Sequence, residues 1–138
     1  MEIMVKEYVK SFYLEKDFNC AETLLKSIAE AYGLDVKPED VKLVGAWGGG
    51  AGCGITCGAL AGSLAALGKL CIGERAHATP GFSALCGEYV KAFEAEFASV
   101  NCRDIKPTPF IPGVRCIDTV ERAADLFDRF VLEHNIVS

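Results

Sequence analysis

Three of the seven cysteines in this 138-residue chain directly follow a residue that favours the start of a helix. The pairs are Asn19-Cys20, Thr56-Cys57 and Asn101-Cys102. Asn and Thr are favoured N-caps because their side-chain oxygens accept hydrogen bonds from free backbone N–H groups. A cysteine just inside a helix start meets the positive end of the helix dipole, which favours the thiolate. Since the thiolate attacks disulfides and binds metals, the sequence predicts activated sulfurs at several helix starts.

A glycine-rich segment over residues 48–54 precedes Cys57 and contains Cys53. The two cysteines are four residues apart, unlike a Cys-x-x-Cys redox pair or a zinc-ribbon knuckle. Such a loop can turn consecutive N–H groups toward an anion, but it lacks the Gly-Lys-Ser/Thr ending of a phosphate-binding P-loop. We therefore expect its N–H groups to donate to thiolate or sulfide sulfur. The glycines expected at this cofactor site are Gly49, Gly50, Gly52, Gly54 and Gly58.

The other cysteines have less distinctive surroundings. Cys71 and Cys86 lie on apolar helical stripes, where a free cysteine is commonly a small core residue. Cys116 is expected one turn into the last helix, whose Val120 and Phe127 point inward. Core packing and a functional role both remain open for Cys116. Gly58 and Gly62 form a ridge of small residues that would let another backbone approach.

Apolar residues recur at helical spacing along most of the chain. The expected helices are 2–15, 20–32, 38–47, 56–71, 82–98 and 114–131, with a short helical turn at 101–105. Pro107, Pro109 and Pro112 should break any regular structure before the last helix. No alternating strand pattern appears. We predict an all-α fold, a single compact domain over 1–138 with five to six helices, in which the glycine-rich loop precedes a buried central helix.

Charge and hydropathy exclude several classes of protein. The net charge is −5 without a Lys/Arg cluster, which argues against nucleic-acid binding. Residues 43–68 carry no charge, but their glycines oppose a continuous helix, so no membrane span is expected. The first ten residues have dispersed charges, unlike a signal peptide. We therefore expect a cytoplasmic protein, in which clustered cysteines are typical of metal binding or catalysis.

The run Cys57-Gly58-Ala59-Leu60-Ala61-Gly62 matches the pattern CGAxxG. With Cys20 before this run and Cys102 and Cys116 after it, the chain resembles the redox-active protein family named for its Cys, CGAxxG, Cys, Cys pattern. The resemblance extends over nearly the whole chain. It implies a small, mostly helical, cytosolic prokaryotic protein whose four cysteines act in redox chemistry or cofactor binding.

Two hypotheses follow from this cysteine set. In the first, four thiolates hold an iron–sulfur cluster for electron transfer or redox sensing, and zinc is the alternative metal. The implied ligands are Cys20, Cys57, Cys102 and Cys116. In the second, a metal-free thiol/disulfide oxidoreductase or sensor uses Cys57 as the attacking thiolate and Cys53 or Cys20 as the resolving thiol. Either activity needs a redox partner protein or a small electron carrier. Separately, the apolar face expected on every helix suggests that the protein forms a homodimer.

Overall fold

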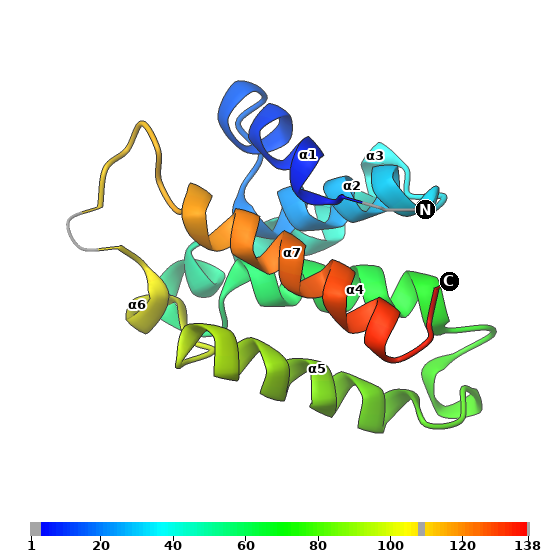
Figure 1. Cartoon of the computed structure of the whole chain (residues 1–138). Coiled ribbons are helices and arrows are strands. Elements are labelled where there is room, and N and C mark those ends of the chain that lie inside the picture. Colours follow the sequence, from blue (N-terminus) through cyan, green and yellow to red (C-terminus); the bar gives the residue numbers. More distant parts are fainter. Residues whose placement is uncertain (1–3, 108–109, 138) are drawn as a thin grey trace.

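Long helices and single helical turns alternate along the chain (Figure 1). The computed structural model describes residues 4–107 and 110–137. Within these residues it contains seven α-helices and no strand. They are α1 (Lys6–Lys10), α2 (Cys20–Tyr32), α3 (Pro38–Val41), α4 (Gly58–Cys71), α5 (Phe82–Phe97), α6 (Cys102–Ile105) and α7 (Ile117–Glu133). Because α3 and α6 are single turns, five longer helices remain, and the all-α prediction is confirmed.

Helical turns of other types extend or connect these helices. A π-helical turn, Ser11–Glu15, continues α1, and a 3₁₀ segment, Lys42–Trp47, continues α3. The glycine-rich loop contains a further π-type turn at Gly50–Gly54, and Ala76–Ala78 form a short 3₁₀ turn before α5. Together, α1 and the π-helical turn cover residues 6–15, in agreement with the described part of the helix predicted over 2–15. Residues 1–3 and Pro109, which the sequence predictions included, lie outside the described residues.

Local sequence signals set both ends of α2. The Asn19 side chain accepts from the Glu22 N–H at 3.0 Å, and the Glu22 carboxylate accepts from the Asn19 N–H at 3.0 Å. This reciprocal capping box satisfies two N–H groups that a helix start leaves free. At the other end, Gly33 adopts the left-handed conformation at φ 65°, which glycine enters without a steric penalty. The predicted start and end of this helix are both confirmed.

Helix α4 lies at the centre of the molecule, between α5 and α7 (Figure 1), and packs most extensively against α2. Small residues make this approach possible, since a Cβ added at Gly62 would collide with the backbone of Ala21. Leu60 and Leu67 of α4 are buried in the main hydrophobic core. The prediction of a glycine-rich loop followed by a buried central helix is therefore confirmed.

The C-terminal helix closes the core with one apolar face. Val120, Phe127 and Val131 of α7 are fully buried, as the helical spacing predicts. Tyr89 of α5 packs edge-on against Phe127, with ring centroids 6.0 Å apart. None of the helices in the described part of the chain combines the length and apolar character needed to cross a bilayer.

Two helix starts differ from the sequence prediction. Helix α4 begins at Gly58 with Cys57 as its N-cap, because Thr56 instead pairs with Asn101 in an isolated antiparallel bridge. Helix α7 begins at Ile117, three residues later than the expected 114. Its delayed start has a backbone cause, since Arg115 has a left-handed φ of 48° that a helix cannot continue through.

Candidate functional site

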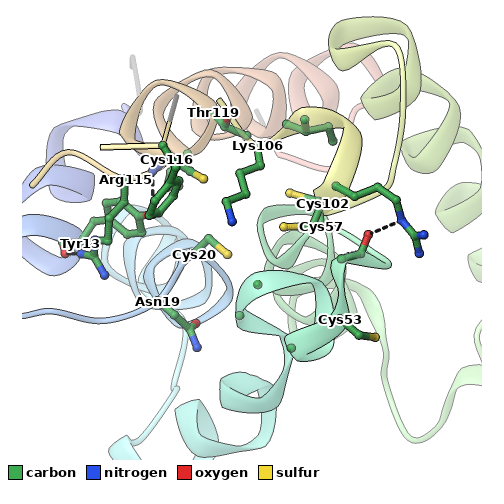
Figure 2. A pocket seen from close by; sticks show the side chains of 18 of the residues that line it. Tyr13, Asn19, Cys20, Cys53, Cys57, Cys102, Lys106, Arg115, Cys116 and Thr119 are labelled. Carbon is green, nitrogen blue, oxygen red and sulfur yellow. Dashed lines mark hydrogen bonds between the residues drawn. The ribbon is translucent and has the colours of Figure 1, made fainter. Parts of the chain in front are cut away.

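Four cysteines from four separate helix starts line one cavity of about 710 Å³. Their sulfur atoms point into a common space, as Figure 2 shows. We call this group the four-cysteine site. Its members are Cys20, Cys57, Cys102 and Cys116. The structure therefore brings together the four residues that the family resemblance implied, although they span 96 positions of the chain.

Cys20 is the first residue of α2 and follows the Asn19 cap. Its position on the central packing surface is fixed by Gly58, where any side chain would collide with the Cys20 sulfur. Burial is the largest influence on the Cys20 thiol and raises its pKa. The backbone N–H groups of Gly49 and Ala21 act in the opposite direction and lower this pKa. Donation from the glycine-rich loop to sulfur stays a prediction, with the Gly49 N–H as its candidate donor.

Cys57 is the N-cap of α4 and only 6% exposed. Thr56 was expected to cap this helix, so the prediction is wrong by one residue. Burial, followed by the nearby Cys20, raises the pKa of the Cys57 thiol to about 12. The N–H groups of Ala59 and Leu60 face the sulfur and lower this pKa, without completing a cap hydrogen bond. A helix start alone therefore does not activate this thiol, because burial outweighs the effect of its N–H groups.

A short backbone strap, formed by residues 55–57 and 100–102, joins the Cys57 and Cys102 sides of the cavity. The Cys57 N–H donates to the Val100 carbonyl at 2.7 Å, and the Cys102 N–H donates to the Ile55 carbonyl at 2.6 Å. Asn101 precedes α6 as expected, but its side chain makes no cap hydrogen bond. The strap therefore positions Cys102 through main-chain pairing.

Glycine is required where the loop meets this strap. Gly50 has a φ of 64°, and a Cβ there would lie 2.6 Å from the Cβ of Cys102 and 2.6 Å from the Ile55 oxygen. Gly49, Gly52 and Gly54 also have left-handed φ angles, and all three line the cavity. A Cβ at Gly54 would come within 3.1 Å of the Arg103 Cβ. The loop thus wraps one wall of the four-cysteine site closely enough to exclude side chains at Gly50.

Cys116 is the N-cap of α7, whereas the sequence placed it one turn inside the helix. Its N–H donates to the Tyr13 hydroxyl at 3.1 Å, which connects this helix start to the N-terminal segment. Burial and then Cys102 raise the pKa of the Cys116 thiol, while the Tyr13 hydroxyl, Lys106 and Arg115 lower it. Cys116 therefore faces the cavity with polar neighbours while it also packs against the edge of the main core.

The remaining cysteines lie outside the four-cysteine site. Cys53 is exposed, its thiol donates to the Gly50 carbonyl at 3.6 Å, and it points away from the other sulfurs (Figure 2). Cys71 and Cys86, predicted as core residues, are only partly buried at the edge of the main core. Cys53 is thus the most accessible sulfur near the cavity, while Cys71 and Cys86 are remote from it.

The four sulfurs surround the cavity without converging on a single point. Among the described residues, no three Cys, His, Asp or Glu side chains are gathered closely enough to hold one metal ion. The thiols still influence one another, because Cys20 and Cys102 raise the pKa of Cys57, and Cys116 and Cys102 raise that of Cys20. Each thiolate formed here would make the next one harder to form.

Sequence reasoning missed Tyr13, Lys106 and Arg115, which also line the cavity. Two of them had a usable signal. Arg115 directly precedes Cys116, and Lys106 follows Cys102 by four residues, so that one helical turn brings its backbone back beside Cys102. Tyr13 carried none, because its contact with Cys116 joins residues 103 positions apart.

The family model described as "Putative redox-active protein (C_GCAxxG_C_C)" matches residues 18–130. The chain belongs to this family. The match includes all four members of the four-cysteine site, and it confirms the resemblance found in the sequence. The family name writes its central motif as GCAxxG, with Gly before Cys. This chain has Cys57 before Gly58, so the pattern CGAxxG describes this chain and differs from the family name in the order of these two residues. No curated protein and no solved structure matches the chain.

Proposed function

We propose that the four-cysteine site holds an iron–sulfur cluster and that the protein uses it in electron transfer or redox sensing. The observation that carries this proposal is the convergence of four sulfurs, each from its own helix start, on one cavity (Figure 2). Four Cys thiolates are the usual ligand set of [2Fe–2S] and [4Fe–4S] clusters. Membership of a family described as redox-active supports the same class of function.

The state of the thiols supports metal ligation over free thiol chemistry. Burial raises the pKa of Cys57 to about 12 and raises those of Cys20 and Cys116 as well. At neutral pH these groups remain protonated and are poor nucleophiles. A metal cation reverses this preference, because its charge stabilises thiolates that otherwise repel one another. Metal loading is therefore expected to release protons from the site.

The spread of the sulfurs favours a multi-atom group over a single ion. Zinc binds thiolates at about 2.3 Å, which requires sulfurs gathered around one point. The described residues contain no such gathering of three ligands, yet four sulfurs face one cavity. When bound, an iron–sulfur cluster would supply reversible one-electron exchange.

Backbone N–H groups and one hydroxyl surround the ligands and would tune this site. The Gly49 N–H lowers the pKa of the Cys20 thiol, and the Ala59 and Leu60 N–H groups lower that of Cys57. The Tyr13 hydroxyl is positioned at Cys116 by the Cys116 N–H. Hydrogen bonds to ligand sulfur stabilise negative charge, and they are among the determinants of the reduction potential.

Anaerobic purification followed by absorption spectroscopy tests the proposal, with iron, acid-labile sulfide and zinc quantified on the same sample. Broad visible absorption with matching iron and sulfide is the expected result. Colourless protein containing zinc would assign the site to that metal. Colourless, metal-free protein with reactive thiols, also after attempted reconstitution with iron and sulfide, would favour thiol exchange by Cys57 and Cys53.

A matched pair of substitutions locates the ligands. Cys102→Ser should lose most of the iron, because the hydroxyl is a weaker ligand for soft metal centres. Cys86→Ala should retain it, because Cys86 does not line the cavity. Equal iron content in wild type and Cys102→Ser would contradict ligation by Cys102. Loss of iron from Cys86→Ala would show that the ligand set has been misassigned.

A further inference from the structure

Positive side chains are concentrated around the cavity of the four-cysteine site. Arg103, Lys106 and Arg115 line it, whereas no Asp or Glu is among the described residues that do so. The chain as a whole has a net charge of −5, so this arrangement opposes the overall charge. A half-enclosed, carboxylate-free cavity with three cations attracts anions.

Both guanidinium groups are held in place by protein partners. The Arg103 Nε donates to the Gly54 carbonyl at 3.1 Å. Arg115 donates to the Tyr13 carbonyl, lies 4.1 Å from the Tyr13 ring centroid and forms an ion pair with Asp17 at 3.2 Å. Arg103 therefore contributes fixed positive charge to the cavity wall, whereas the charge of Arg115 is partly offset by Asp17.

Like Arg103, Lys106 pairs with no carboxylate among the residues that the structure describes, and unlike both arginines its side chain donates no hydrogen bond to any of them. Its N–H donates to the Cys102 carbonyl at 2.8 Å, which fixes its backbone at the end of α6. Its side chain extends into the cavity in Figure 2, and its ammonium lies 4.7 Å from the Phe110 ring centroid. The ammonium can therefore donate hydrogen bonds to a ligand while it lies over the face of the Phe110 ring.

The size of the cavity suits a small molecule. The cavity, which the proposed cluster would share with the ligand, has a volume of about 710 Å³, within the range of small-molecule ligand sites, roughly 300–1,000 Å³. Such sites combine an apolar lining with a few convergent polar groups. Ile105 and Val120 supply apolar wall here, and Lys106 supplies the principal polar contact.

We propose that this cavity binds a small anionic molecule, a carboxylate or an oxyanion, beside the four-cysteine site, with Lys106 as its principal contact. Arg103 adds positive potential that draws the anion in, and Arg115 adds less because Asp17 pairs with it. The inference rests on the proposed function, because it assigns an anionic ligand class to the same redox site.

Calorimetric titration with sodium sulfate and sodium acetate tests this site, since the two probes represent oxyanions and carboxylates. Low ionic strength is needed because salt screens the attraction. Wild type should bind at least one probe, and Lys106→Gln should weaken that binding about tenfold or more through loss of a charge-assisted hydrogen bond. Lys106→Arg should retain most of it.

Lys91→Gln is the matched control, since Lys91 is exposed on α5 and does not line the cavity. It removes the same charge and should leave binding unchanged. Absence of binding by wild type with both probes would overturn the proposal, as would equal affinities of the Lys106→Gln and Lys91→Gln variants. Iron and sulfide measured on the same samples keep failure of the cluster proposal distinguishable from failure of the anion site.

Discussion

Replacing Gly62 by alanine should force α2 away from α4 and disturb the four-cysteine site. The new Cβ would lie 2.9 Å from the carbonyl carbon of Ala21 and 3.0 Å from its Cα, and closer still to its oxygen. Ordinary contacts between carbon atoms begin near 3.5 Å, so the carbon contacts alone require a separation of about 0.6 Å and the closer oxygen requires more. Because these atoms are main chain, no side-chain rotation can relieve the overlap.

The size of the effect follows from two opposing terms. Overpacking costs about 1–3 kcal/mol, and a collision between two backbones belongs at the upper end of that range. Alanine recovers about 1 kcal/mol over glycine inside a helix. The free energy of unfolding should therefore fall by about 2 kcal/mol, which lowers the melting temperature by roughly 6–8 °C for a domain of this length.

Gly87→Ala provides the control, because Gly87 lies within α5 and a Cβ there would meet nothing within 4 Å. This variant should gain up to about 1 kcal/mol from helix propensity. Thermal and urea unfolding of both variants, followed by circular dichroism, gives the comparison. A Gly62→Ala variant at least as stable as wild type would refute the packing argument. Iron content should also fall more in Gly62→Ala, because Ala21 adjoins Cys20.

Three further changes test separate parts of the structure. Asn19→Ala should lower the free energy of unfolding by about 1 kcal/mol through loss of the α2 cap, measured by urea denaturation. In metal-free protein at pH 8, iodoacetamide should modify exposed Cys53 before Cys57, because burial raises the pKa of the Cys57 thiol to about 12. Peptide mass spectrometry measures the order of modification, and modification of Cys57 first would show that burial does not protect it. Burial raises the pKa of Asp128, so the folded state holds this proton more tightly than the unfolded state. Wild type should therefore lose stability relative to Asp128→Asn as the pH rises from about 4, and parallel stability curves from urea unfolding would contradict this.

Signals contained within one helical turn predicted the fold well. The Asn19–Glu22 capping box and the left-handed Gly33 need only neighbouring residues, and both occur as expected. The sequence prediction misplaced the start of α4 because of a pairing between distant residues, and the start of α7 because of a backbone angle. Thr56 is drawn into a bridge with Asn101, 45 positions away, and the φ of Arg115 has no marker in its residue type.

The four-cysteine site was foreseen from the cysteine pattern, but its electrostatic surroundings were not. Asn-Cys and Thr-Cys pairs suggested activated thiolates, whereas burial raises the pKa values of Cys20 and Cys57. Burial depends on packing between distant helices, and no local pattern reports it. Lys106 and Arg115 are close to Cys102 and Cys116 in the sequence, but only the fold shows that they line the same cavity.

The backbone strap gives the two edges of the four-cysteine site different mechanical properties. At Cys57 and Cys102, two main-chain hydrogen bonds fix the spacing whatever side chains surround them. At Cys20 and Cys116, the spacing depends on how α2 and α7 pack, including the contact of Cys116 with Tyr13. The first edge is therefore preorganised by the polypeptide itself, while the second can be adjusted by substitutions in the core. Such an arrangement lets the chemical properties of the site diverge between related sequences without loss of its basic geometry.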